Sequence, residues 1–529
     1  MTGDGGILGA TMSRLPIFSL LVSILFGVSL GLAGCGSSAG TPGGGSGGAT
    51  GNASGGASGA SGGANGGGSG GSNNSSGGAG GSVAPIDAPV DSPASIDGAA
   101  DKALAPGDAP AACTATAAAG QPRRPFPQHS GYPGCATCIH PTVAQTTMDA
   151  DVGRYYDAWK TLIKKFTAGA VNGENYIAAG AAGNIFGWPA NVKQVSQSEG
   201  HGYAMLITAL MAGHDPNAKT VFDSLNRVRK AFPSSSDPRL MSWVVPGTGD
   251  PTIKAQPPAT DGDMDMGYSL LIAYDQWGDE ATNHYLADAK SVIAGMEAKF
   301  ITTGSGQYYP RLNIGDPTHL GSVAPESKPD LTRPSDYMVD HMLAFAAITG
   351  HTVWSDVAAG SVAILKQVGN ADTGLVPDFV VDNPPVGSKT GTGDEGPCYD
   401  CFGYNSCRVP WRQAVAVVQF GYAGSLDVDN KMATWARTKY NDTPSAMKAS
   451  FPTNGDDSNA GGSDPSFTSP MVAAGVTNAA HQTWLDRGWT YMKGTNGGDY
   501  YGGSITLLSM LAVSGNWWIP TGATGACSP

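Results

Sequence analysis

Two short segments place carboxylates directly ahead of apolar stretches. Asp261, Asp263 and Asp265 alternate along Ala-Thr-Asp-Gly-Asp-Met-Asp-Met-Gly, and the residues that follow are mostly apolar. Glu199 occupies the same kind of position in Ser-Glu-Gly-His-Gly-Tyr-Ala-Met. Charged groups beside buried structure are costly to dehydrate, so such positions are often functional. Carboxyl groups held near one another are also what general acid and base catalysis needs.

Helix capping is the structural alternative for both segments. Thr260 is placed to cap a helix that carries Asp263 in its first turn, and Ser196 or Ser198 is placed to cap one that carries Glu199. Acidic residues also suit the positive end of a helix dipole. On this interpretation the aspartates after Asp261 cap the helix and stay solvated.

The positioning elements are predicted to be helices. Apolar residues recur at helical spacing in about a dozen stretches. The expected helices are 151–166, 202–212, 216–232, 263–277, 282–300, 335–349, 352–368, 411–424, 429–439, 470–477, 480–493 and 502–513. Stretches such as 203–211 are apolar nearly all round and must be buried, whereas 282–300 is amphipathic. This mixture predicts an all-α fold with two concentric layers of helices, joined by long loops in which binding residues tend to lie.

The first 112 residues are expected to lie outside the folded domain. Arg14 precedes an apolar run that ends in Leu-Ala-Gly-Cys35, which is typical of a secretory signal and resembles a bacterial lipoprotein box. An ordinary signal peptide is the alternative. Residues 36–112 are rich in Gly, Ser, Ala and Pro and cannot bury enough apolar surface to fold. We expect a signal peptide with a lipobox at 1–35, a disordered linker at 36–112 and the folded domain at 113–529.

Charge and cysteine content limit which partners and metal ions the chain is expected to bind. The net charge is −13 with no basic stripe, which argues against nucleic acid. In an exported chain, cysteines form disulfides by default, although the pairs Cys135/Cys138 and Cys398/Cys401 would also suit a four-thiolate zinc site. The aspartate segment opens like a calcium loop, but Met266 stands where that loop requires Gly. We expect no metal and no cofactor.

Four segments, in the same order along the chain, resemble glycoside hydrolase family 8. Segment 259–277 matches the family signature except at Gly267, where the family usually has Ala. Segment 198–205 is similar to the family's acid segment, 402–412 to a third block and 500–517 to its C-terminal helix. The resemblance implies an (α/α)6 barrel with an open cleft. It also implies endo-acting hydrolysis of β-1,4-linked glycans with inversion.

The resemblance also implies roles for the two carboxylates of the opening segments. By family position, Glu199 is the general acid and Asp261 is the carboxylate that contacts the sugar at the cleavage point. Inversion requires a protonated carboxyl and an ionised carboxylate about 6.5–9.5 Å apart on opposite faces of the sugar. A helix N-terminus favours the ionised form of Glu199, so burial and the charge of Asp261 must favour the protonated one.

The general base is where the chain departs from many members of the family. Those members have Asp after the Tyr of the third block, but this chain has Asn405, whose amide cannot take a proton from water. The subfamily with Asn there, similar to lichenases and a chitosanase, takes its base from a Glu in the preceding loop. Glu395 is the only Glu in that loop, so we expect it to be the base, with Asp394 and Asp400 as alternatives.

Three further side chains are candidates for substrate contacts. Trp243 lies in the loop before the signature and offers a flat face to a sugar ring, while Tyr404 and Arg408 flank the base region. Packing is the alternative for each.

The sequence thus predicts a monomeric, exported glycoside hydrolase acting on a polysaccharide. It is anchored at the cell envelope or surface through a lipid on Cys35, and otherwise secreted. The preferred substrates are β-1,4-glucan or mixed-linkage β-glucan, and chitosan comes next. The first rival is a carbohydrate-binding protein without activity on the same scaffold. The second is a structural surface protein with capped helices.

Overall fold

The computed structural model describes residues 120–179, 185, 187–315, 330–389 and 398–522. The predicted signal peptide with Cys35 and the predicted linker lie outside these residues, as does Glu395. The chain divides into two compact units, Met1–Asp97 and Gly98–Pro529, and every described residue belongs to the second. Within the described ranges, no helix has the length and apolar character needed to cross a membrane.

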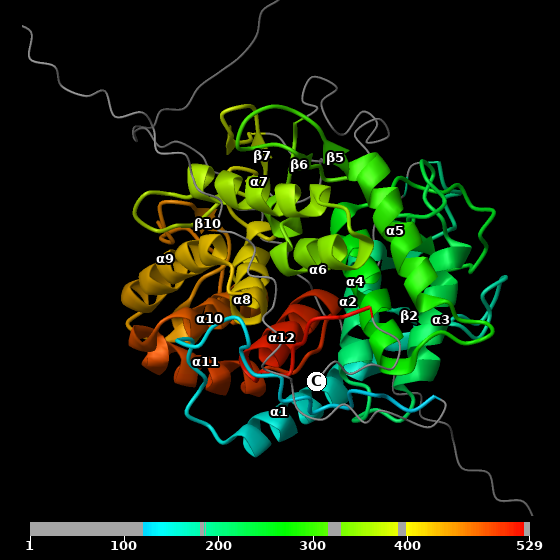
Figure 1. The fold of residues 1–529 in the computed structure, drawn as a ribbon, viewed down its shortest axis with the longest axis horizontal. Coiled ribbons are helices and arrows are strands. Elements are labelled where there is room, and N and C mark those ends of the chain that lie inside the picture. The colour runs from blue at the N-terminus through cyan, green and yellow to red at the C-terminus, as the bar shows by residue number, and fades with distance from the viewer. Residues whose placement is uncertain (1–119, 180–184, 186, 316–329, 390–397, 523–529) are drawn as a thin grey trace, which may run out of the picture. The chain divides into compact units, whose positions relative to one another are not determined.

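The described residues form twelve α-helices, which alternate along the chain between an outer and an inner layer (Figure 1). The outer helices are α1 (Gln145–Trp159), α3 (Ala218–Ala231), α5 (Tyr285–Phe300), α7 (Val353–Val368), α9 (Ala423–Lys439) and α11 (Gln482–Gly494). The inner helices are α2 (Ser198–Leu210), α4 (Thr260–Trp277), α6 (Val339–Thr349), α8 (Val409–Phe420), α10 (Pro465–Ala474) and α12 (Tyr500–Val513).

The inner helices form a closed ring. Each one packs against the next, and α12 packs back against α2. Each outer helix covers one inner helix, with α1 on α12, α3 on α2, α5 on α4, α7 on α6, α9 on α8 and α11 on α10. This arrangement is the predicted (α/α)6 barrel, so the all-α prediction is confirmed.

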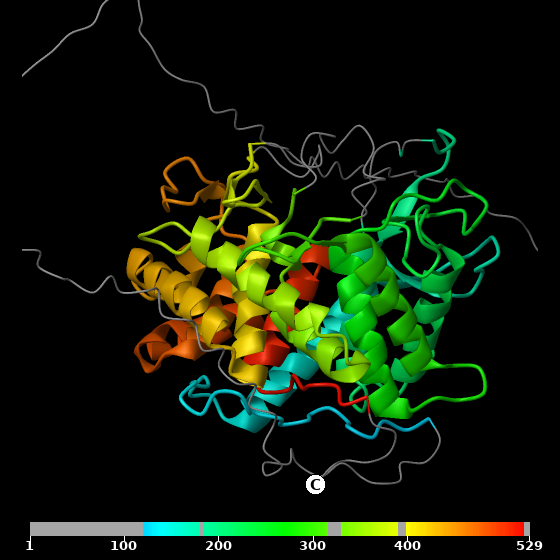
Figure 2. The ribbon, with the colours of Figure 1, turned by 45° about the horizontal axis from the view of Figure 1, so that its top comes forward.

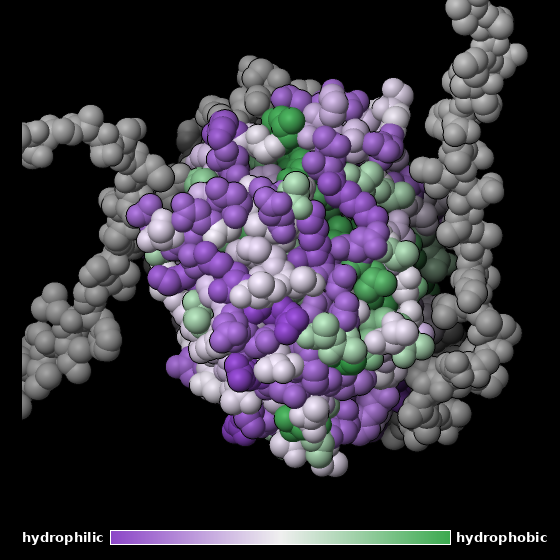
Figure 3. All heavy atoms as spheres, turned by 90° about the vertical axis from the view of Figure 1, so that its left-hand side faces the viewer, coloured by the Kyte–Doolittle hydropathy of each residue, from purple (hydrophilic) through white to green (hydrophobic). Residues whose placement is uncertain are grey.

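Burial follows the two layers. Every residue of α4 is buried, and nearly every residue of α2 and α12 is buried too, because inner helices meet neighbours on all sides. The outer helices bury one face only. Figure 3 shows the face of the barrel that carries α9, and it is largely hydrophilic. The apolar stretches that looked too hydrophobic for a surface are therefore the inner layer.

Short strands occupy the long loops between the helices. They form five two-stranded antiparallel sheets. The pairs are β1 (Ile163–Lys165) with β2 (Asn175–Ile177), β3 (Gln194–Gln197) with β4 (Val244–Pro246), β5 (Ile301–Thr302) with β6 (Arg311–Leu312), β7 (Val380–Val381) with β8 (Val386–Gly387), and β9 (Cys401–Phe402) with β10 (Phe451–Pro452). Figure 2 shows loops and short strands gathered along one edge of the helical layers.

Two helix boundaries differ from the prediction for identifiable reasons. The first helix ends at Trp159 rather than at residue 166, because Ile163–Lys165 pairs with Asn175–Ile177 as strands. The tenth helix begins before its expected start at Pro470. Pro465 occupies its first turn, where no amide hydrogen is needed, and the Asp464 side chain accepts from the Ser466 amide (2.9 Å) as the cap.

A buried carboxyl in α9 makes the stability of the barrel depend on pH. Neither oxygen of Asp429 has a hydrogen-bond partner among the described residues, and burial raises the pKa of Asp429 well above its ordinary value. The unfolded chain ionises this group near about pH 4, while the folded protein keeps it protonated. Stability therefore falls as the pH rises above about 4.

We expect Asp429→Asn to remove this part of the pH dependence. Because Asn is neutral at every pH, the melting temperature of the variant should fall less than that of the wild type between about pH 5 and about pH 8. The control is Asp427→Asn on the same helix, since Asp427 is exposed and pairs with Lys366 at 2.7 Å. It should follow the wild type. An Asp429→Asn profile parallel to that of the wild type would show that Asp429 ionises in the folded protein.

Candidate active site

The two predicted acidic residues meet at one end of the barrel. Glu199 is the second residue of α2 and Asp261 is the second residue of α4, and these helices are neighbours in the inner ring. Strand β3, which pairs with β4, leads directly into α2, and the Ser198 amide donates to the Trp243 carbonyl (2.9 Å) where the helix begins. Asp261 is 3% exposed and the Glu199 side chain is 13% exposed.

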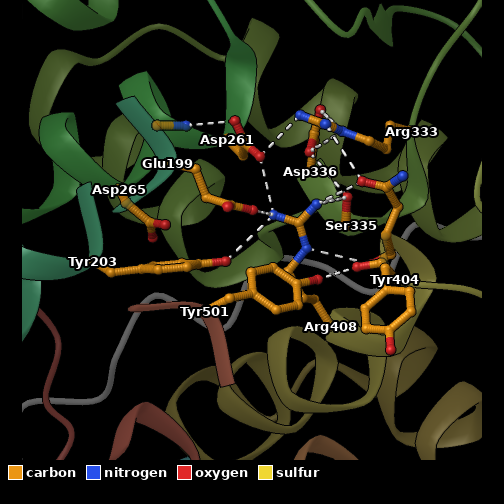
Figure 4. A network of polar contacts seen from close by, with 12 residues as sticks. Glu199, Tyr203, Asp261, Asp265, Arg333, Ser335, Asp336, Tyr404, Arg408 and Tyr501 are labelled. Atoms are coloured by element: carbon orange, nitrogen blue, oxygen red, sulfur yellow. Dashed lines mark hydrogen bonds and ion pairs between the residues drawn. The ribbon is translucent and has the colours of Figure 1, made fainter. Parts of the chain in front are cut away.

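Arg408 joins the two carboxylates (Figure 4). It is the last residue of the short 3-10 helix η4 (Ser406–Arg408), which precedes α8, and its side chain is 1% exposed. Its Nη1 contacts the Glu199 carboxylate, lies 3.0 Å from Asp261 Oδ2 and donates to the Tyr203 hydroxyl (3.3 Å). A buried guanidinium with several fixed acceptors holds these side chains in one geometry.

The other amino group of Arg408 extends this network. Its Nη2 donates to Ser335 Oγ (3.0 Å) and to Asn405 Oδ1 (2.9 Å). Ser335 belongs to η3 (Pro334–Asp336), just ahead of α6. On the far side, Gln197 Nε2 donates to Glu199 Oε2 (3.3 Å) and also contacts the Tyr500 hydroxyl of α12. The N-terminal ends of α2, α4, α6, α8 and α12 thus meet in one site.

Asp261 is ionised at any ordinary pH. Burial alone would raise the pKa of this carboxyl, but Arg333 and Arg408 lower it to about 2. Arg333 Nη2 lies 2.9 Å from Asp261 Oδ2, and the Gly262 amide donates to Oδ1 (2.9 Å). The site therefore contains a fixed negative charge next to Glu199.

Arg333 and Asp336 were missed by the sequence interpretation. Arg333 Nε donates to Asp336 Oδ1 (3.0 Å), and burial with the nearby charge of Asp261 raises the pKa of Asp336 to about 6, although Arg333 opposes this. A signal was present, because Arg-Pro-Ser-Asp stands at the start of the predicted helix 335–349. It is the same pattern that drew attention to Glu199 and Asp261.

The predicted helix caps are wrong. The N-cap positions of α2 and α4 are Gln197 and Ala259, and neither side chain accepts a capping bond. The Thr260 hydroxyl donates instead to the Asn313 carbonyl (2.6 Å), which is distant in sequence.

The two aspartates after Asp261 are not solvated, contrary to the sequence interpretation. Asp263 and Asp265 are both fully buried. Asp263 Oδ1 accepts from the Met241 amide (3.0 Å), and burial raises the pKa of Asp263 well above its usual range. Asp263 is therefore a neutral hydrogen-bonding group between α4 and a loop, not a charge.

Asp265 is an ionised structural residue. Its two oxygens lie 2.8 and 2.6 Å from the guanidinium of Arg412 on α8, and His341 Nε2 on α6 contacts Oδ1 at 3.0 Å. Burial would raise the pKa of Asp265, but Arg412 and then His341 lower it. Through Arg412 and His341, Asp265 thus links the three inner helices α4, α8 and α6.

Arg412→Met should destabilise the fold. It leaves the Asp265 charge buried without its main partner, so we expect the free energy of unfolding to fall by about 3–5 kcal/mol. The control is Lys366→Met, which removes the solvent-exposed pair with Asp427 and should cost under about 1 kcal/mol. Denaturant unfolding measures both. Equal losses would contradict a structural role for the Asp265–Arg412 pair.

The three candidate substrate-contact residues differ in exposure. Trp243 is half-buried beside the start of α2. Tyr404 is 43% exposed, donates to Asp464 Oδ2 (3.3 Å) and packs edge-on against Phe467. Arg408 is buried and bonded to the carboxylates, so its contacts in this structure are to the protein.

Asn405 and the candidate bases lie around the third block. Asn405 is buried, and its side-chain oxygen accepts from Arg408 and, at 3.4 Å, from Arg333. Asp400 forms an ion pair with Lys389. Glu395 and Asp394 lie outside the described residues.

Asp378, also missed by the sequence interpretation, fixes the third block. Its Oδ1 accepts from the amides of Gly403 (3.1 Å), Asn405 (3.1 Å) and Ser406 (2.7 Å) and from the Ser406 hydroxyl (2.8 Å). Burial raises the pKa of Asp378 to about 7 in spite of these donors. Asp378 thereby holds the turn that presents Asn405 and Arg408.

The two C-x-x-C pairs each close on themselves. Cys135 is bonded to Cys138 and Cys398 to Cys401, so the structure joins each pair as a disulfide rather than bringing the four sulfurs to one zinc site. Cys407 is a buried free thiol.

Comparison with known proteins identifies the family. The family model described as glycosyl hydrolases family 8 matches residues 181–515. An endoglucanase from Bacillus sp. (strain KSM-330) is 37% identical over 405 residues, covering 75% of this chain and 82% of that protein. A beta-glucanase from Niallia circulans is 36% identical over 403 residues, covering 75% and 92%.

A solved structure is similar to this chain in both sequence and fold. The apo structure of a beta-1,3-1,4-glucanase from Paenibacillus sp.X4 has a TM-score of 0.66 and 34% identity, and the match covers 75% of this chain and all of that one (100%). Together with the ring of inner helices and the carboxylates on α2 and α4, these matches show that the chain belongs to glycoside hydrolase family 8 and is an O-glycosyl hydrolase.

Proposed function

We propose that the protein is an inverting, endo-acting hydrolase of β-1,4-linked glucans, with mixed-linkage β-1,3-1,4-glucan as its best substrate. The names of its relatives support this substrate class. The observation that carries the catalytic proposal is the placement of Glu199 and Asp261 on one buried arginine at the N-terminal ends of adjacent helices.

In this mechanism Glu199 is the general acid. It is the less buried of the two carboxylates, so it is the one that a leaving oxygen can approach. Arg408 and Gln197 contact its oxygens in the free enzyme, which favours the carboxylate. Entry of the substrate excludes water from the site and favours the protonated form that must deliver its proton.

Asp261 stabilises the sugar as positive charge develops at the anomeric carbon. Its pKa of about 2 keeps it ionised, and Arg333 and Arg408 fix its position. A preorganised charge close to the reacting centre lowers the barrier without any reorganisation at the moment of reaction.

Glu395 is the proposed base, with Asp394 and Asp400 as alternatives. Both ends of its loop are bonded to Phe379. The Phe379 amide donates to the Tyr399 carbonyl (3.0 Å), and the Ser388 amide donates to the Phe379 carbonyl (2.8 Å). Both ends therefore adjoin Asp378, which holds the third block. Asn405 is an amide and Asp400 already forms an ion pair with Lys389, which leaves Glu395 and Asp394. We prefer Glu395 because the subfamily with Asn at this position takes its base from a Glu of this loop.

Export and a lipid anchor at Cys35 remain part of the proposal, supported by the Leu-Ala-Gly-Cys motif and the polar tether that follows it. We also propose that the protein is a monomer.

The rival function, a carbohydrate-binding protein without activity, is disfavoured because Glu199 and Asp261 are both retained.

A panel of polysaccharides tests the function. We expect release of reducing ends to be fastest on mixed-linkage β-glucan, slower on carboxymethyl-cellulose, and slow on chitosan and xylan. A rapid fall in viscosity relative to the release of reducing ends would confirm endo action. Faster hydrolysis of chitosan would overturn the choice of substrate, and tight binding of β-glucan without hydrolysis would support the rival.

A further inference from the structure

A surface groove runs along the outer helix α9. It has a volume of about 640 Å³, and most of the residues that line it lie on α9, among them Thr434, Trp435 and Thr438, while Asp372 comes from the loop after α7. α9 covers α8, which stands opposite α2 in the ring of inner helices. The groove therefore lies on the other side of the barrel from the helix that carries Glu199, on the face shown in Figure 3.

Trp435 gives the groove a fixed flat surface. Its indole is half-buried, with ring centroids 5.8 Å from Phe451 and 5.9 Å from Tyr440. Gly455 lies so close that a Cβ there would come within 2.7 Å of the indole. These contacts hold the ring in place before any ligand arrives.

The polar rim of the groove carries no net charge. Two carboxylates, Asp372 and Asp427, balance two ammonium groups, Lys431 and Lys439. Two of these four are already neutralised by partners, since Asp427 pairs with Lys366 and Lys439 lies 3.0 Å from Asp457.

The remaining rim residues are Asn430, Thr434 and Thr438, which provide amide and hydroxyl groups. A flat aromatic side chain surrounded by hydroxyls, amides and balanced charges suits a neutral polyhydroxylated chain better than an ionic one. Nothing in the rim selects for an anionic or a cationic polymer.

We propose that this groove is a second binding site for the neutral β-glucan chain that the active site cleaves. The identity of the ligand rests on the proposed function. A polymer held at α9 stays near the active site, which raises its effective concentration there. A short oligosaccharide cannot occupy both sites at once and gains nothing from the groove.

The test compares polymer and oligosaccharide. We expect Trp435→Ala to lower kcat/KM on mixed-linkage β-glucan by about threefold to tenfold, the range for one aromatic stacking contact, and to leave kcat/KM on a tetrasaccharide of the same glucan unchanged. Because Trp435 also packs against Phe451, a second variant fills the groove and keeps the indole. Thr438→Trp should produce the same selective loss.

A matched control is available on α11. The Thr490 hydroxyl donates to the Asp486 carbonyl four residues earlier, just as the Thr438 hydroxyl donates to the Thr434 carbonyl, and both threonines are exposed. Thr490 does not line the groove. Thr490→Trp should therefore leave both activities at the wild-type level.

Binding without turnover separates the two proposals. Glu199→Gln protein, with its active site saturated by the tetrasaccharide, should still be retarded in a gel that contains β-glucan, and Thr438→Trp in that background should abolish the retardation. Three results would overturn the proposal that the groove binds β-glucan: equal losses on polymer and tetrasaccharide, unchanged polymer activity, or retardation that persists with Thr438→Trp. Failure of the wild type to hydrolyse β-glucan would overturn the proposed function, while selective retardation through the groove would still stand.

Discussion

Glu199→Gln should lower kcat on mixed-linkage β-glucan by about 10²- to 10⁴-fold. The amide keeps the shape of the side chain and its acceptor for Arg408, but it has no proton to give to the leaving oxygen. The expected loss is specific to the acid step. An aryl glycoside of a short glucan whose leaving group needs no protonation should therefore be cleaved at close to the wild-type rate.

The folded state of this variant is checked by its melting temperature. Glu174→Gln is the control, since Glu174 pairs with Arg227 (2.8 Å) away from the site and should leave activity unchanged. Equal losses on the polymer and on the activated aryl glycoside would contradict the role of Glu199 as the acid.

Glu395→Gln should also abolish polymer hydrolysis, but the activated leaving group should not rescue it. A fully active Glu395→Gln protein would refute the assignment of the base.

Asp261→Asn should lower kcat by at least about 10²-fold and change KM much less. Asn preserves the size of the side chain and can still accept from the Gly262 amide, but it removes the charge that Arg333 and Arg408 hold in place. Because the pKa of Asp261 is about 2, the wild-type enzyme does not lose this charge within the ordinary pH range. The defect of the variant should therefore be the same from about pH 4 to about pH 9.

Asp263→Asn provides the matched control two residues along the same helix. Asp263 is buried and protonated, and Asn can accept from the Met241 amide in the same way. We expect its activity to stay within about twofold of the wild type, because no charge is lost. If both substitutions impaired kcat equally, the effect would come from the packing of α4 and not from the charge of Asp261.

The sequence predicted the barrel well because its helices are marked by local patterns. Each predicted stretch overlaps a helix, and the run 203–211, predicted to be buried because it is apolar nearly all round, lies in α2 of the inner layer. Boundaries were less predictable where the chain makes partners distant in sequence. The first helix stops at Trp159 because the residues after it pair with a strand, which no local spacing reveals.

The candidate site was predictable in its carboxylates but not in its partners. Glu199 and Asp261 lie in recognisable motifs, whereas the buried arginine that joins them comes from a segment well over a hundred residues downstream. The caps failed for the same reason, since Thr260 donates to a carbonyl from a distant loop. Local sequence reports which groups are present. The ring of inner helices decides which of them meet.

The anomeric form of the first product tests the central claim most directly. Proton NMR recorded during the first minutes of mixed-linkage β-glucan hydrolysis reports this form before mutarotation equilibrates it. An inverting endo-hydrolase with Glu199 as its acid must produce α-anomeric reducing ends first. If the β anomer appeared first, or if no new reducing ends appeared at all, the account of this site would be contradicted.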